Sequence, residues 1–125
     1  MTVEIQTNLD VYIKDPAMEP PAHWCKILAV SDDAATMTTF KLPSGTENMV
    51  IPFPGITTLT TLWVAMDKDM EVTVGDPAEN ALKVVKADSV LGFSHGELPA
   101  ATALTVSYTS PEGEMATMTL IWAGH

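Results

Sequence analysis

Hydrophobic and polar residues alternate with a period of two along most of this chain, and the N-terminus shows the pattern most clearly. Aliphatic residues hold five odd positions between Val3 and Ile13, and polar residues hold the even positions from Glu4 to Asp10. A period of two places one kind of side chain on each face of a β-strand. The pattern therefore predicts one long one-sided strand, or two collinear strands, over residues 3–13.

Prolines interrupt the chain after this first strand. Asp15-Pro16 and Pro20-Pro21 lie close together, and proline offers no N–H to a sheet and restricts the residue before it. Residues 14–22 are therefore predicted to be an extended connector. We expect residues 1–23 to form an arm that could add a strand to a neighbouring subunit, and residues 24–125 to form the core.

The same alternation and the turn residues predict the remaining strands, at 24–30, 36–42, 49–53, 57–66, 70–74, 82–93, 104–109 and 117–122. Pro52 and Pro54 bracket one apolar segment, which limits it to an edge strand or a loop over the core. The segment 57–66 is apolar on both faces, which favours a central or interface strand.

Short turns between strands predict two hairpins. One joins 57–66 to 70–74 around Asp67-Lys68-Asp69, and the other joins 104–109 to 117–122 around Ser110-Pro111-Glu112-Gly113. A single helical turn is expected at Asp76-Pro77-Ala78-Glu79, because a cap, a proline and an acid stand at the right spacing.

This order of elements predicts an all-β fold, either an antiparallel β-sandwich or a jelly-roll-like small barrel with an extended N-terminal arm. The length of 125 residues suits one domain spanning 1–125. No apolar run is long enough to cross a bilayer, and the N-terminus lacks the features of a secretory signal. Synthesis in a cytoplasm is therefore expected.

Charge narrows the choice of partners. Sixteen acidic residues face six basic ones, all of them lysine, and the formal net charge is −10. Phosphate contacts and base readout rely on clustered arginine and lysine, so neither direct nucleic-acid binding nor an anionic membrane partner is expected. Cys25 is the single cysteine, which rules out an intrachain disulfide and is expected to be a half-buried apolar side chain.

One catalytic pattern is present, because residues 92–96 read Gly-Phe-Ser-His-Gly and fit the G-x-S-x-G nucleophile elbow. An elbow lies between a strand and a helix, whereas Glu97-Leu98-Pro99 follows here. Ser94 is therefore predicted to lie in a turn between strands. We expect no catalytic residue and no enzyme activity.

The residue types that bind metals and sugars are present but do not form recognised motifs. His23, His95 and His125 lack the spacing of a zinc site, so no metal or cofactor is expected. Asp32-Asp33 and Asp67-Lys68-Asp69 leave a calcium loop open, although neither has the ligand count or glycine of a recognised loop. The tryptophans and tyrosines could line a sugar-binding face, but packing is the favoured use. These aromatic residues are Tyr12, Trp24, Trp63, Tyr108 and Trp122.

The order of segments in residues 57–124 resembles small β-sandwich structural proteins of tailed-bacteriophage virions. The resemblance covers a threonine/leucine-rich strand at 57–66, a Val-Thr-Val strand at 72–74, a strand with an apolar end at 87–93, a Leu-Thr-Val strand at 103–107 and a final strand ending in Ala-Gly at 116–124. Where those proteins have a glycine/asparagine turn after the Val-Thr-Val strand, this chain has a longer segment at 75–80.

The resemblance implies a capsid cement or decoration protein on the virion exterior, which binds the major capsid protein or other virion proteins and forms a homo-oligomer, with a trimer favoured. It implies no catalytic residues. The residues expected at the capsid or subunit contact are Trp24, Met49, Ile51 and Phe53. The alternatives are a tail or head–tail adaptor component and, from another class, a carbohydrate- or calcium-binding β-sandwich module.

Overall fold

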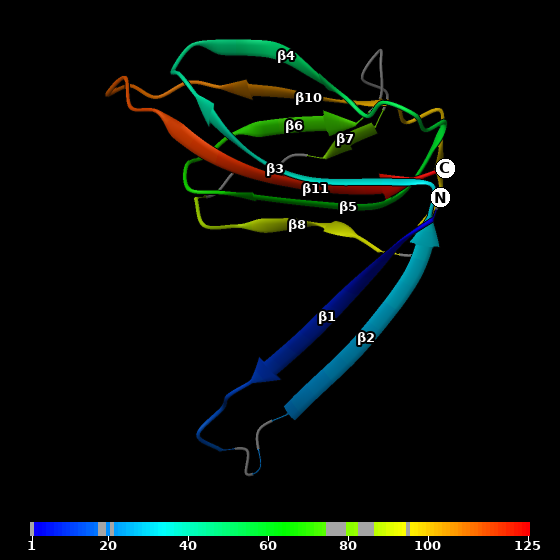
Figure 1. The fold of residues 1–125 in the computed structure, drawn as a ribbon. Coiled ribbons are helices and arrows are strands. Elements are labelled where there is room, and N and C mark those ends of the chain that lie inside the picture. The colour runs from blue at the N-terminus through cyan, green and yellow to red at the C-terminus, as the bar shows by residue number, and fades with distance from the viewer. Residues whose placement is uncertain (1, 18–19, 21, 75–79, 83–86, 95) are drawn as a thin grey trace.

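The structure is a computed structural model that describes residues 2–17, 20, 22–74, 80–82, 87–94 and 96–125. Every regular element in these residues is a β-strand (Figure 1). None of the described residues forms a helix that could span a membrane. The helical turn expected at residues 76–79 lies outside the described residues.

The strands follow one another along the chain in the order β1 (Val3–Ile13), β2 (Ala22–Asp32), β3 (Ala34–Leu42), β4 (Thr46–Pro52), β5 (Thr58–Met66), β6 (Glu71–Val74), β7 (Asn80–Leu82), β8 (Val90–Phe93), β9 (Leu98–Pro99), β10 (Ala103–Tyr108) and β11 (Ala116–Gly124). One sheet has the order β4-β10-β6-β7, a second has the order β3-β11-β5-β8 with β9 also paired to β5, and β1 pairs with β2 alone. All of these pairs are antiparallel.

The two larger sheets form a sandwich whose core lies between them. In β11 the side chains of Ala116, Met118, Leu120 and Trp122 are buried, and the residues between them are half-buried. That alternation is what a strand with one face on the core should show. The Phe53 and Trp122 rings meet in this core, with centroids 5.2 Å apart. The predicted all-β antiparallel sandwich is confirmed.

Both hairpins expected from the sequence are wrong. β5 pairs with β11, β8 and β9, whereas β6 belongs to the facing sheet. β10 likewise pairs with β4 and β6, and β11 lies in the other sheet. A strand crossing to the other sheet shows the same alternation as a hairpin partner, because both bury one face in the same core. The short turns therefore bridge the two sheets.

Two of the other strand predictions are confirmed and one is wrong. β4 is at the edge of its sheet and β5 is central in the other, as the sequence indicates. The single strand expected over residues 82–93 is wrong, because β7 and β8 lie in different sheets. β8 needs glycine at position 92, since a Cβ there would overlap the backbone carbonyl of Leu62 on β5.

The β1–β2 pair is a long hairpin that projects away from the sandwich (Figure 1). Its register runs without a break from Val3 opposite Asp32 to Ile13 opposite Ala22. The first strand is thus a single strand, as one of the two sequence readings has it. Its partner is β2 of its own chain, so the projecting arm includes both strands.

Asp32 anchors the base of this hairpin, where β2 passes into β3. Its side chain is 4% exposed, and its carboxylate accepts a hydrogen bond of 2.5 Å from the Thr60 hydroxyl. The ring Nδ1 of His125 lies 3.3 Å from the other carboxylate oxygen. The backbone N–H of Asp33 donates to the Gly124 carbonyl at 3.1 Å. These contacts hold the hairpin against the sandwich.

We predict that Asp32→Ala lowers the free energy of unfolding by about 1–3 kcal/mol, because it removes a buried, charge-assisted hydrogen-bond acceptor. Urea denaturation followed by tryptophan fluorescence measures this loss. Asp33→Ala is the matched control, since this neighbouring side chain is exposed and should change stability by less than about 0.5 kcal/mol. Equal effects of the two substitutions would contradict the anchor.

Candidate interaction surface

The hairpin has two chemically different faces, because side chains alternate along each strand and directly opposed residues share a face. The apolar face carries Ile5, Thr7, Leu9, Val11 and Ile13 of β1 and Ala22, Trp24, Lys26, Leu28 and Val30 of β2. The polar face carries Glu4, Gln6, Asn8, Asp10 and Tyr12 of β1 and His23, Cys25, Ile27, Ala29 and Ser31 of β2.

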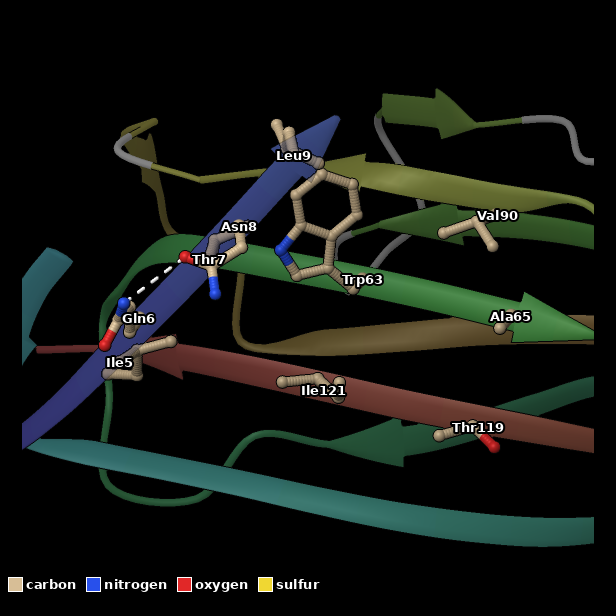
Figure 2. Close-up of a pocket in the computed structure, with 10 residues that line it drawn as sticks. All are labelled: Ile5, Gln6, Thr7, Asn8, Leu9, Trp63, Ala65, Val90, Thr119 and Ile121. Atoms are coloured by element: carbon tan, nitrogen blue, oxygen red, sulfur yellow. Dashed lines mark hydrogen bonds between the residues drawn. The ribbon is translucent and has the colours of Figure 1, made fainter. Parts of the chain in front are cut away.

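The base of the hairpin lies over the outer face of the β3-β11-β5-β8 sheet and leaves a groove of about 370 Å³ between them. Figure 2 shows Leu9 of the hairpin next to Trp63 of β5, and Ile121 on the neighbouring strand β11. The Thr7 hydroxyl lies 3.5 Å from the Ser94 hydroxyl. The hairpin therefore touches the sheet without closing on it.

Trp63 leaves a polar group unpaired in this groove. Its indole N–H is buried and has no hydrogen-bond partner among the described residues, and the Thr61 hydroxyl on the same strand is in the same state. A buried donor without an acceptor costs about 1–3 kcal/mol.

Beyond the groove the apolar face continues uncovered to the tip of the hairpin. Val11, Ile13 and Trp24 are 52%, 59% and 52% exposed, and we call these three residues the apolar tip. A two-stranded hairpin is at best marginally stable alone in water, and uncovered apolar surface marks sites of association. The apolar tip is the clearest candidate binding surface in the described residues.

The residues expected at a capsid or subunit contact lie in three different environments. Trp24 belongs to the apolar tip, and Met49 is partly buried against the core. Ile51 and Phe53 are 8% and 2% exposed, so their side chains face the core and are not available at the surface of this structure. Alternation around Pro52 does not reveal which face of β4 is buried, and here Val50 is the exposed neighbour.

Ser94 follows β8 and precedes β9, so a strand stands where the nucleophile elbow has a helix. Its hydroxyl is near Thr7, and no imidazole or carboxylate of the described residues hydrogen-bonds to it. His95 lies outside the described residues. Ser94 thus lies at a bend in the segment between two strands.

Three of the four carboxylates that left a calcium loop open bind groups of the chain itself. Asp67 accepts a hydrogen bond from the Thr117 backbone N–H at 2.7 Å, and Asp69 accepts one from the Ala87 N–H at 2.6 Å. Asp32 is the buried anchor described above. Each of these side chains therefore already has a structural role in holding a turn or a strand end.

The aromatic residues do not gather into one exposed shelf. Tyr108 and Trp122 are buried, and Trp63 lines the groove. Tyr12 and Trp24 are exposed but project from opposite faces of the hairpin. This arrangement gives no support to the sugar-binding alternative.

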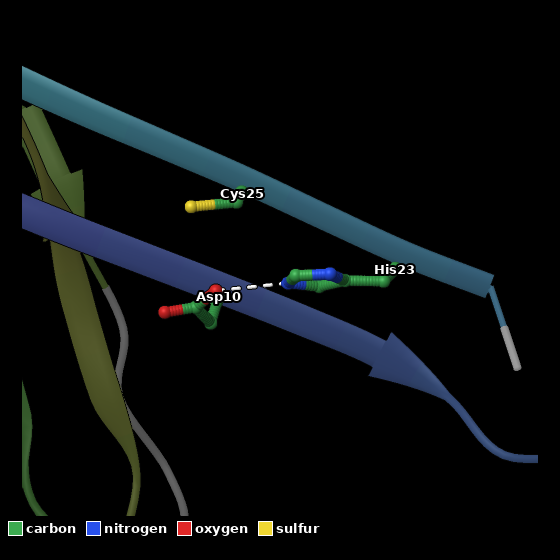
Figure 3. A group of neighbouring side chains, drawn as sticks. All are labelled: Asp10, His23 and Cys25. Atoms are coloured by element: carbon green, nitrogen blue, oxygen red, sulfur yellow. Dashed lines mark hydrogen bonds and ion pairs between the residues drawn. The ribbon is translucent and has the colours of Figure 1, made fainter.

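Three potential metal ligands meet on the polar face of the hairpin, where Asp10 is directly opposite Cys25 (Figure 3). His23 Nε2 lies 2.9 Å from Asp10 Oδ1, and the donor atoms of all three side chains lie within 4.8 Å of one another. The hydrogen bond with His23, followed by one with Cys25, lowers the pKa of the Asp10 carboxyl. The hydrogen bond to Asp10 raises the pKa of the Cys25 thiol.

Sequence reasoning missed this group because it weighed only the spacing of the histidines. Asp10 is separated from His23 by a connector containing several prolines, and the three side chains come together only through the hairpin register. Pairing residues 3–13 with the strand that follows the connector was the signal that could have found them.

Comparison with known proteins adds no relative. No family model, no curated protein and no solved structure matches the chain. Its function must therefore be argued from the fold and the surfaces described above.

We predict that His23→Phe raises the pKa of Asp10 toward the ordinary value of 3.8, because phenylalanine keeps a ring beside Tyr12 but cannot hydrogen-bond. A carboxyl ¹³C NMR titration measures the change. Folding lowers this pKa, so the contact stabilises the hairpin at pH values above the ordinary pKa of Asp10. That contribution is lost as the pH falls through the lowered pKa of the folded protein. An Asp10 pKa that does not respond to the substitution would disprove the pairing.

Proposed function

We propose that this chain is a structural protein that acts by binding other proteins of a larger assembly, and that it is a cement or decoration protein on the head of a tailed-phage virion. The apolar tip carries the associative part of the proposal, because three large apolar side chains project on an arm without cover from their own chain. The resemblance of residues 57–124 to virion β-sandwich proteins supports the setting.

Two kinds of contact are open to the arm. Burying the exposed parts of Val11, Ile13 and Trp24 against an apolar surface would contribute about 1 kcal/mol for each side chain. β1 and β2 form a two-stranded sheet, so their outer edges can also accept a strand from a partner. Each copy would then bind weakly, and many copies on one shell would stabilise it together.

The charge of the chain supports a protein partner on the outside of a shell. The net charge is −10 and the sequence has no arginine, a balance that opposes contact with packaged DNA. On the apolar face of the paired strands, Lys26 is the one charged residue beyond the base. A partner surface that is apolar and uncharged would suit this face best.

We predict that the double variant Val11→Thr/Trp24→Ser binds capsids lacking the protein at least about tenfold more weakly than the wild type, since about 1.4 kcal/mol of lost contact corresponds to that factor. Sedimentation with capsids followed by gel densitometry measures the bound copies. Ile27→Thr is the matched control, because Ile27 is 64% exposed on the opposite face of the same strand. The control should bind as the wild type does.

The same measurement separates the alternatives. Saturable binding of many copies over the shell, with greater resistance of the capsid to heat, supports the cement role. A few copies per particle would place the protein at the tail or the head–tail vertex instead. Absence of binding, or equal binding by the double variant, would overturn the proposed role of the apolar tip.

A further inference from the structure

We propose that Asp10, His23 and Cys25 form a site for one Zn²⁺ ion per chain on the polar face of the hairpin (Figure 3). The strand pairing brings Asp10 opposite Cys25. His23 is opposite Tyr12, and these two residues form the next pair on the same face. The inference rests on these side chains alone and does not depend on the proposed virion role.

The chemistry of the three donors selects the metal. A thiolate sulfur, an imidazole nitrogen and a carboxylate oxygen are the ligand types that zinc takes in proteins. Calcium and magnesium prefer sets made of oxygen atoms, and this group offers one carboxylate. Borderline-soft divalent ions, with zinc foremost, are therefore the ions that this group suits.

The distances fit a tetrahedral ion after small side-chain rotations. Zinc bonds of about 2.0–2.3 Å to nitrogen, oxygen and sulfur place neighbouring ligand atoms about 3.3–3.7 Å apart. The nitrogen–oxygen pair of His23 and Asp10 starts closer than this, at 2.9 Å, and the widest separation in the group is within 4.8 Å. All three side chains are exposed, so an ion can reach them from solvent.

Tyr12 orients the imidazole before any metal arrives. Its ring stacks on the His23 ring with centroids 4.1 Å apart and an interplanar angle of 2°. This stack holds His23 flat on the polar face while its Nε2 points to Asp10. Cys25, directly opposite Asp10, brings its thiol into the same group. The three donor atoms thus already converge, and zinc would bind Cys25 as the thiolate, with release of the thiol proton to solvent.

Three ligands leave one position of the ion open, for a water molecule or for a group of a bound protein. The ion would also tie β1 to β2 in a two-stranded hairpin, a structure that is at best marginally stable alone in water. Binding to the paired hairpin and not to the separated strands would stabilise the pairing by mass action.

Cobalt(II) substitution tests the site in the full-length protein, because a cobalt–thiolate bond produces a charge-transfer absorption that the free ion lacks. We expect one cobalt per chain, with this absorption, and its displacement by zinc. Cys25→Ser should abolish the charge-transfer band, and His23→Phe should weaken zinc affinity at least about tenfold, the scale on which even outer-shell changes act. Ile27→Ser on the same face should keep both properties.

A second readout uses the wild type alone, so it does not depend on whether a variant still forms the hairpin. Zinc added to the wild type should shift the amide NMR signals of residues 8–12 and 23–26 and slow their hydrogen exchange. The proposal is overturned if cobalt binds without a thiolate band, if Cys25→Ser binds zinc as tightly as the wild type, or if light scattering shows two chains sharing each ion.

Discussion

The burial of one face of each sandwich strand in a shared core is the constraint on which the rest of this structure depends. Leu62 and Val64 of β5 face Val72 of β6 and Leu104 of β10 across the core. An antiparallel strand has only two faces, so a strand that gives one to the core must present the other outward. What the protein can bind is therefore set by the outer faces and by the strands that leave the sandwich.

The β1–β2 hairpin follows from the same rule but lacks a second layer over most of its length. Its apolar face meets the sheet at Ile5 and Leu9 and then runs past it. Asp32 holds the base through Thr60 and His125, which leaves the tip as the part that another molecule can cover. The two faces thereby separate two kinds of chemistry, apolar contact on one side and potential metal ligands on the other.

Polar groups in this molecule are mostly engaged in holding the chain together. Asp67 and Asp69 accept backbone hydrogen bonds at turns, and the Tyr108 hydroxyl donates to the Glu114 carbonyl at 2.7 Å. The indole N–H of Trp63 is an exception among the described residues, because it lies unpaired beside the groove.

The sequence by itself determined the fold class and the position of most strands, because a period of two and the turn residues act locally. It located the edge strand β4 and the central strand β5 through Pro52 and a run that is apolar on both faces. Only the tertiary structure decided which strands pair. β5 and β6 alternate like hairpin partners, and so do β10 and β11, yet the two strands of each couple lie in opposite sheets.

The same limit applied to the candidate sites. The sequence marked Trp24 as a contact residue but could not show that Ile51 and Phe53 face the core, since an apolar residue near a proline suits either face. Asp10 and Cys25 become neighbours through a hairpin register that residues 14–22 do not specify. Local patterns fix the conformation of a segment, whereas proximity of distant side chains depends on how the strands pair and pack.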